Sequence, residues 1–337
     1  MPNSSDITRQ YQAAVSSAAL HHRTDRALIE VTGADRVTWL NNLVTNVIKT
    51  LKAGEGNYAF ATNVKGRTVF DLDMLVLEDR LRLDVAASRR GTALTHLNKY
   101  TITEDVTLAD KSADFTRVAV MGPRAGDIVQ AVGFGNLGPM ADLQHLAGRI
   151  DGVDARMVRN DYAGLPTAEF IIPADAAEKT IAAITSAVSG LSVEHLTNET
   201  IDVFRIEAGI PASARDIDDE VVPPETGQIE RGISYHKGCY LGQEVIERMR
   251  SHNILARKLV GLRPDGADAL SPGSLIKRDD KEIGRITSTC WSEALGAPLA
   301  LGYVKTIHAK PDTPVMIEGE SGQRTGKVVS LPVRAKG

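Results

Sequence analysis

The chain has 337 residues, of which 42% are hydrophobic, and a formal net charge of −4. This length and apolar content suffice for a large buried core and for two or three domains, whereas the slightly negative charge argues against broad electrostatic capture of nucleic acid or an anionic membrane. No stretch approaches the ~18 apolar residues of a membrane-spanning helix, and residues 1–6 lack the features of a secretory signal, so we expect a cytoplasmic protein.

The cysteine and histidine content argues against a metal site. Cys239 and Cys290 are the two cysteines, and they form no Cys-x-x-Cys pair. Two thiols cannot supply the four thiolates typical of an iron–sulfur cluster, and they are too few for a disulfide scaffold. The eight histidines are scattered without metal-type spacing. We therefore expect no stably bound metal ion.

The first part of the chain predicts an internal repeat. The first twenty-odd residues predict a peripheral helix and a frayed end. Residues 28–43 then predict a strand, a glycine turn and a helix, and residues 118–132 predict the same order. A strand at 81–85 leads into a helix, and a strand at 169–175 does likewise.

Each half therefore predicts strand, helix, strands, helix, strand. This is the order of a split βαβ, ferredoxin-like fold. We predict an α+β protein with two pseudo-repeated halves, about 24–110 and 115–258, that share a central cavity suited to a ligand. The alternative is that helices and strands alternate by chance, as they do in many chains of this class.

After Arg257 and Lys258 the sequence changes to short apolar runs between Gly, Pro and Asp turns. This pattern is typical of a small β-barrel. We predict a barrel domain over 260–337, preceded by a ligand-binding region over 1–259.

The run 236–244, His-Lys-Gly-Cys-Tyr-Leu-Gly-Gln-Glu, places Cys239 at a glycine-flanked turn before a predicted helix. Unpaired backbone N–H groups at the helix start, with Lys237 and His236 close by, are a setting that lowers a thiol pKa. The alternative is a small residue buried at a turn.

Two carboxylates are candidates for binding a ligand. Glu169 lies in a predicted strand with apolar neighbours, which disfavours a solvated side chain. Asp71 follows a predicted hairpin whose turn, Asn-Val-Lys-Gly, begins at Asn63. Asp71 points either into the cavity or into solvent, and the pattern leaves both open.

The run Lys237–Glu244 resembles the Lys-Gly-Cys-Tyr-x-Gly-Gln-Glu signature of the YgfZ-type folate-binding proteins. These are relatives of the glycine-cleavage aminomethyltransferase and are implicated in the assembly or repair of iron–sulfur proteins, including those used in tRNA modification. Arg205–Pro211 resembles the Arg-x-Glu-x-Gly-x-Pro element of the same superfamily, and Pro223–Glu225 resembles the Pro-x-Glu element that follows it. The three motifs occur in the family's order.

The resemblance implies tetrahydrofolate or a one-carbon derivative in the central cavity, with Glu169 at the pteridine edge. Arg205 is the second implied ligand; the alternative is an ion pair with Glu207 or another carboxylate. The expected catalytic residues are Cys239, Lys237 and Asp71, and the expected cofactor-binding residues are Glu169, Arg205, Tyr240 and Asn63.

Phe70 departs from the transferase pattern, which has an Asp-Asp pair where this chain has Phe70-Asp71. Since a phenyl ring cannot protonate an amine, we expect folate binding without ordinary aminomethyltransferase activity. The predicted function is a folate-binding accessory protein that contacts iron–sulfur client or assembly proteins transiently and binds neither nucleic acid stably nor membrane. The alternatives are a folate-dependent aminomethyltransferase or demethylase, and a binding module whose pocket is a relic.

Overall fold

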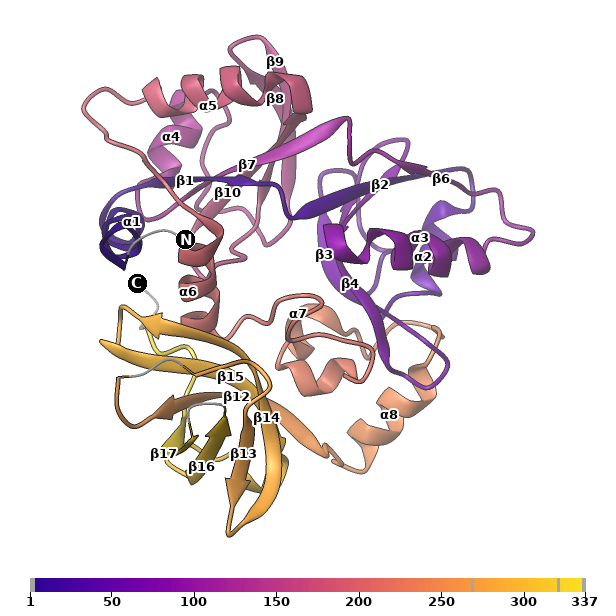
Figure 1. Ribbon diagram of the computed structural model, residues 1–337. Helices are drawn as coiled ribbons and strands as arrows, with labels where there is room; N and C mark the ends of the chain where they lie inside the picture. The colour runs from indigo at the N-terminus through magenta and orange to yellow at the C-terminus, as the bar shows by residue number, and fades with distance from the viewer. Residues whose placement is uncertain (1–3, 268–269, 320–321, 335–337) are drawn as a thin grey trace.

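The computed structural model describes residues 4–267, 270–319 and 322–334. Two sheet-containing halves lie beside each other, and a β-barrel lies below them in the view of Figure 1. The predicted α+β fold, with two halves and a C-terminal barrel, is confirmed.

The first half contains a five-stranded sheet with the strand order β3-β4-β5-β2-β6. Two helices, α2 and α3, pack on one face of it, where apolar side chains such as Leu40 and Leu97 meet those of the strands. The elements of this half are β2 (Arg26–Thr32), α2 (Arg36–Asn41), β3 (Gly56–Thr62), β4 (Thr68–Val76), β5 (Leu81–Ala86), η1 (Ala87–Arg89), α3 (Arg90–Lys99) and β6 (Thr107–Asp110).

The second half repeats this arrangement in a six-stranded sheet with the order β11-β1-β7-β10-β9-β8. Its helices α4 and α5 cover the corresponding face, and one additional strand, β1, separates β7 from β11. The elements are β1 (Ala19–Arg23), β7 (Phe115–Met121), α4 (Ala125–Ala131), β8 (His145–Ile150), β9 (Val153–Arg159), β10 (Thr167–Pro173), η2 (Ala174–Ala176), α5 (Ala177–Ser186) and β11 (Glu194–His195).

The N-terminal segment is more deeply integrated than the sequence indicates. The helix α1 (Ser4–Ser16) buries Tyr11, whose ring stacks on Phe204 with centroids 4.5 Å apart. The strand β1 then pairs with β7 of the second sheet, and the chain passes almost directly into β2 of the first sheet. Residues 23–26 therefore lie where the chain crosses between the halves.

The face of each sheet that carries no helices points toward the other half. Strand alternation puts Arg82 and Asp84 of β5 on this face, and Arg117 and Glu169 of the second sheet occupy the equivalent face. The Arg117 Nε atom contacts an Asp84 carboxylate oxygen, so an ion pair joins the halves.

The helix α6 (Asn198–Ala208) connects the second half to the rest of the chain. The Thr197 hydroxyl accepts a hydrogen bond from the Thr200 N–H at its start, and Gly209, at φ +75°, ends it in the left-handed conformation that glycine adopts without strain. The segment then forms η3 (Pro223–Thr226), α7 (Ile229–Gly232) and α8 (Gln243–Ser251).

The C-terminal strands close into a barrel with the order β12-β15-β14-β13-β16-β17. Alternate residues of these strands, Val260 and Leu262 among them, fill its interior. Its elements are β12 (Arg257–Pro264), β13 (Leu275–Arg278), β14 (Lys281–Ser292), β15 (Ala297–Lys305), η4 (Thr306–His308), β16 (Pro314–Gly319) and β17 (Gly322–Val329).

Within the described part of the chain, no helix combines the length and the apolar character needed to cross a membrane.

Candidate ligand-binding cavity

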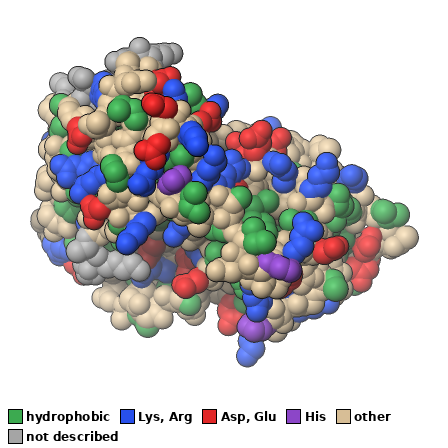
Figure 2. Space-filling view, turned by 90° about the horizontal axis from the view of Figure 1, so that it is seen from below, with side chains coloured by type: hydrophobic (Ala, Val, Ile, Leu, Met, Phe, Trp, Pro, Cys, Tyr) green, Lys and Arg blue, Asp and Glu red, His purple; other side chains and the backbone are tan. Residues whose placement is uncertain are grey.

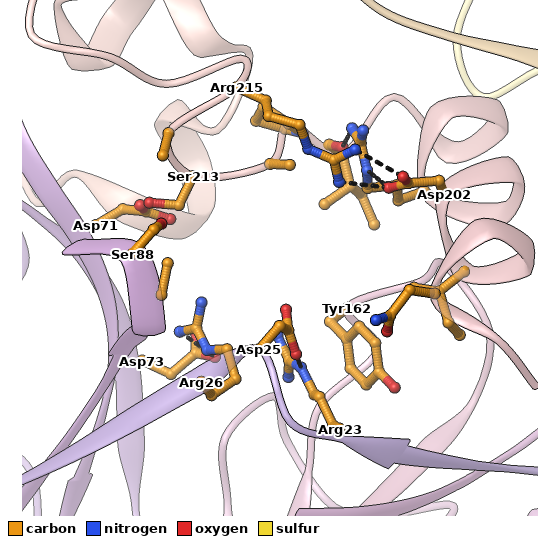
Figure 3. Close-up of a pocket in the computed structure, with 18 of the residues that line it drawn as sticks. Arg23, Asp25, Arg26, Asp71, Asp73, Ser88, Tyr162, Asp202, Ser213 and Arg215 are labelled. Atoms are coloured by element: carbon orange, nitrogen blue, oxygen red, sulfur yellow. Dashed lines mark hydrogen bonds and ion pairs between the residues drawn. The ribbon is translucent and has the colours of Figure 1, made fainter. Parts of the chain in front are cut away.

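A cavity of about 520 Å³ lies between the two halves and the segment that contains α6 and α7 (Figure 3). Its lining is rich in charged and polar side chains, which come from β1, β2, β3, β4, η1, the loop between β9 and β10, α6, α7 and the loops beside them. These residues are His21, Arg23, Asp25, Arg26, Tyr58, Asp71, Asp73, Ser88, Tyr162, Asn198, Asp202, Arg205, Ser213, Arg215, Gln228 and Arg231.

Asp71 and Asp73 enter the cavity from β4 because residues two apart share one face of a strand. The Tyr58 hydroxyl donates to one oxygen of Asp71 at 2.9 Å. The other oxygen, Oδ1, is buried and has no hydrogen-bond partner among the described residues. Asp73 accepts a hydrogen bond from the Asn160 amide at 3.0 Å, and an oxygen of Asp73 lies 3.6 Å from Arg231 Nη2.

Phe70 points to the opposite face of β4 and is 1% exposed in the core under the helices of the first half. The sequence-based argument that Phe70 removes one of two cavity carboxylates is therefore wrong. Neighbouring residues of a strand face opposite sides, so a carboxylate at 70 would point away from the cavity. Asp73 supplies the second carboxylate instead. The spacing Asp71-x-Asp73 within a strand would have predicted it.

The crossing between β1 and β2 contributes three charged residues that sequence analysis missed: Arg23, Asp25 and Arg26. The Arg23 guanidinium lies 3.9 Å from the centre of the Tyr162 ring. Arg26 donates to Asp84 and has a nitrogen 3.9 Å from Asp73. Only the crossing of one strand between two sheets brings these residues to the cavity, and no local pattern predicts it.

Glu169 is buried, with 3% of its surface exposed, but it is not one of the residues that line the cavity. Its carboxylate accepts hydrogen bonds of 3.2 Å from Arg23 and from Asn160, and it lies 3.5 Å from Arg117 Nε. Burial raises the pKa of Glu169, and the charge of Arg23 opposes that shift. Glu169 thus contacts the cavity lining through Arg23.

Arg205 lines the cavity, and its guanidinium nitrogens donate hydrogen bonds to other protein groups. Its Nε donates to Asp202 at 2.6 Å, Nη1 to Asp216 at 2.7 Å and Nη2 to the Ser288 hydroxyl at 2.9 Å. The ion pair with Asp216 joins α6 to the following loop, and the bond to Ser288 joins it to β14 of the barrel. Glu207 instead accepts hydrogen bonds from the hydroxyl of Tyr11 and from β14.

His21 forms part of the opposite wall, and its two ring nitrogens lie 2.8 Å from the Tyr162 hydroxyl and 2.9 Å from the Asn198 amide oxygen. Burial lowers the pKa of His21 to about 4, so the ring is neutral near pH 7. A neutral ring can donate one of these hydrogen bonds and accept the other. The cavity wall is therefore an ordered polar surface.

The Asn63 turn and the Lys237–Glu244 run, far apart in sequence, lie against each other outside the cavity. Gly242 has φ +80°, and a Cβ atom there would come within 2.4 Å of the Asn63 carbonyl oxygen. The Thr62 hydroxyl donates to the Leu241 carbonyl at 2.5 Å. Asn63 itself shapes the turn, since its side-chain oxygen accepts from the N–H groups of residues 65 and 67.

The predicted site residues thus fall into two groups. Asp71 and Arg205 line the cavity and Glu169 contacts its lining through Arg23, whereas the residues of the second group, Asn63, Lys237, Cys239 and Tyr240, do not line it.

Within the second group, Cys239 is exposed, while Tyr240 is buried and its hydroxyl has no partner among the described residues. The Lys237 ammonium donates to the backbone carbonyls of Asn41, Val44 and Asn46. Among the described residues, no cluster of three or more His, Cys, Asp or Glu side chains is arranged to hold a metal ion.

Comparisons with known proteins agree with this architecture. Residues 3–234 match the family described as GCVT N-terminal domain, and residues 257–333 match the family described as glycine cleavage T-protein C-terminal barrel domain. An aminomethyltransferase of Rubrobacter xylanophilus is 27% identical over 302 residues, which cover 88% of this chain and 79% of that protein. An aminomethyltransferase of Cutibacterium acnes is 28% identical over 342 residues, which cover 98% of this chain and 90% of that protein.

Among solved structures, the glycine cleavage system aminomethyltransferase T from Bartonella henselae has the same fold, with a TM-score of 0.82 at 20% identity. The similarity covers 98% of this chain and 90% of that one. Because the first family alone accounts for more than half of the residues, and the barrel family for most of the remainder, this chain belongs to the GCVT family.

Proposed function

We propose that this protein binds a reduced folate, tetrahydrofolate or a one-carbon derivative, in the cavity between its halves. The observation that carries the proposal is Asp71, which lines the cavity and whose buried Oδ1 has no hydrogen-bond donor among the described residues. A reduced pterin presents an amino group and ring N–H donors along one edge, and such an edge would satisfy this acceptor. The cavity volume falls in the range of small-molecule sites.

The rest of the lining suits the same ligand. Tyr162 offers an aromatic wall beside Arg23, and Arg215 lies toward one side of the cavity, where it forms an ion pair with Asp202 (Figure 3). Guanidinium groups bind carbonyl and carboxylate oxygens, both of which a folate carries. The membership in the GCVT family, whose named relatives are aminomethyltransferases, supports this choice of ligand.

Within the family, we propose that the protein is of the YgfZ type and assists the assembly or repair of iron–sulfur proteins, including those that modify tRNA. The support is the Lys237–Glu244 run and the exposed position of Cys239 outside the cavity. A thiol in that position can meet a client protein, while the folate occupies the cavity. The site of action would be the cytoplasm.

The proposed partners are client or assembly proteins that bind transiently. On the face seen in Figure 2, basic and acidic side chains are interspersed and hydrophobic ones are scattered among them. Mixed charge of this kind does not favour stable binding of a polyanion such as nucleic acid.

A second candidate function is aminomethyl transfer or demethylation that depends on folate. Two observations favour it: the names of the relatives, and the presence of both Asp71 and Asp73 in the cavity. A carboxylate near a reacting amine can act as general acid or base. Sustained formation of methylenetetrahydrofolate from an aminomethyl donor at ~1 s⁻¹ or faster would establish this function. Tight folate binding without turnover would favour the accessory role.

Calorimetric titration with tetrahydrofolate tests the folate proposal. Asp71→Asn should weaken binding roughly tenfold or more, because a hydrogen bond to a buried charge contributes about 1.5–3 kcal/mol. Asp79→Asn is the matched control, since the Asp79 carboxylate is 65% exposed at the turn between β4 and β5. Absence of binding to the wild-type protein, or equal affinity of the wild-type and Asp71→Asn proteins, would refute the proposal.

A further inference from the structure

We propose that Lys237 is a positioning residue: the ammonium of this half-buried side chain binds the loop that carries Cys239 to the turn after α2 and so fixes the thiol at the surface. This inference concerns the second group of predicted residues and is independent of the folate proposal. It assigns to Lys237 a role through the backbone rather than direct chemistry on the thiol.

The geometry of the ammonium carries the proposal. Lys237 Nζ lies 2.5 Å from the carbonyl oxygen of Asn41, 2.6 Å from that of Val44 and 2.8 Å from that of Asn46. An ammonium has three N–H donors and no acceptor, so these three bonds use its entire capacity. No donor remains for the sulfur of Cys239.

The three carbonyl acceptors lie at the end of α2 and in the turn that follows it, where backbone carbonyls need a hydrogen-bond donor. Asn41 is the last residue of α2, and carbonyl groups at a helix end lack intrahelical partners and favour a cation. Among the described residues, no carboxylate lies within ion-pair distance of Lys237. Its charge is therefore balanced by the three carbonyl dipoles, which favour the protonated form and oppose the lowering of the pKa of Lys237 by burial and by Lys49.

Three further hydrogen bonds join the turn after α2 to both ends of the loop 232–242. The Thr45 hydroxyl donates to the Gly232 carbonyl at 2.6 Å, the Ser234 N–H to the Thr45 carbonyl at 3.0 Å, and the Leu241 N–H to the Asn42 carbonyl at 3.0 Å. Lys237 fastens the middle of the loop.

Between these hydrogen bonds, residues 238 and 239 of the loop are exposed. Cys239 is exposed, and a Cβ atom built on Gly238 would meet no atom within 4 Å. Lys237 therefore binds the loop on its protein side, while its solvent side stays accessible. This arrangement gives a reason for the spacing Lys-Gly-Cys: the lysine points inward, the glycine leaves room for an approaching backbone, and the thiol points outward.

The wild-type protein itself offers the first test, by acetylation of the native full chain with acetic anhydride and mass spectrometry of each lysine. Lys49 and Lys65 are exposed and serve as internal references. Lys237 should react at least tenfold more slowly than either, because the three carbonyls keep its nitrogen protonated, and an ammonium has no lone pair with which to attack the anhydride. Acetylation of Lys237 as fast as that of Lys49 would overturn the proposal, and this result does not depend on any variant folding.

The second test is chemical rescue of Lys237→Ala. Loss of the ammonium should raise amide hydrogen exchange in residues 41–46 at least tenfold and change the rate at which iodoacetamide alkylates Cys239, with the rate at Cys290 unchanged. Propylammonium, which replaces the deleted atoms, should restore both readouts. Tetramethylammonium, which has the charge but no N–H donor, should not.

An electrostatic role for Lys237 would give a different pattern. Lys237→Ala would then shift the pH dependence of Cys239 alkylation while hydrogen exchange in residues 41–46 stayed at its wild-type rate. That result would also overturn the proposal.

Discussion

Arg23 and Glu169 form a pair in which one side chain lines the cavity and the other supports it. Arg23 stacks on Tyr162 and donates to Glu169 at 3.2 Å, while Asn160 and Arg117 hold the carboxylate from other sides. Asp25 also lies 3.4 Å from Arg23 Nε, but its side chain is 55% exposed, so Glu169 is the buried counter-charge of this guanidinium. Glu169 therefore fixes both the position and the charge balance of Arg23.

A double-mutant cycle should expose this dependence. Glu169→Gln and Arg23→Gln should each weaken tetrahydrofolate binding roughly tenfold, and the double variant should lose little more than either single one, since both changes remove the same interaction. Calorimetry on the four proteins measures it. Additive losses would show that Glu169 contacts the folate independently of Arg23, as the family resemblance implies.

The pH dependence of stability belongs to the residue scale as well. The pKa of His21 falls from its ordinary value of 6.5 to about 4 because the ring is buried. Between these values the unfolded chain binds a proton that the native protein does not, so the free energy of unfolding decreases as the pH falls from 6.5 toward 4. The slope from one histidine is at most about 1.4 kcal/mol per pH unit.

His21→Gln keeps a polar side chain but removes the titration. Denaturant unfolding of both proteins at several pH values should show the wild type losing stability relative to the variant over this window. Parallel pH profiles of the two proteins would contradict the burial of a neutral His21.

At the scale of elements, α6 connects the cavity to the barrel. Arg205 on α6 pairs with Asp216, whose side chain is fully buried, and reaches Ser288 in β14. The same helix buries Glu207, which accepts hydrogen bonds from α1 and from β14. The two motif residues of Arg-x-Glu thus join three parts of the molecule.

Arg205→Met should lower the free energy of unfolding by about 3–5 kcal/mol, because it leaves Asp216 buried without its partner. Arg215→Met is the matched control: the Arg215 side chain is 53% exposed, and an exposed ion pair contributes about 0–1 kcal/mol. Denaturant unfolding measures both. Full stability of Arg205→Met, combined with loss of folate affinity, would instead show that Arg205 serves the ligand.

Local patterns predict those elements whose partners are near in sequence. The hairpin of β3 and β4, the helices α2 and α4 after their glycine turns, and the short barrel strands follow from apolar periodicity and turn residues. The strand β1 has a weak pattern, Ala-Leu-His-His-Arg, and its partner β7 lies about a hundred residues away. Its pairing depends on long-range packing that no local signal contains.

At the scale of the whole molecule, the candidate site lies where the first half, the second half and the segment with α6 and α7 meet. The family resemblance implied Asp71 and Arg205 as site residues, and strand alternation extends this expectation from Asp71 to Asp73. Arg23 and Arg26 required the structure, because a strand that crosses between two facing sheets brings them to the cavity. The resemblance also implied Cys239 as a catalytic residue, but Cys239 is not among the residues that line the cavity. Cys239 is instead exposed on the loop before α8.

The most direct test of the central claim is a crystal structure of the full chain with a stable reduced folate such as 5-formyltetrahydrofolate. We predict the pteridine between the two halves, with a donor atom within about 3.2 Å of Asp71 Oδ1, which has no partner in the described part of the chain. An empty cavity at a folate concentration that saturates the protein in solution, or a pteridine bound elsewhere on the molecule, would contradict it.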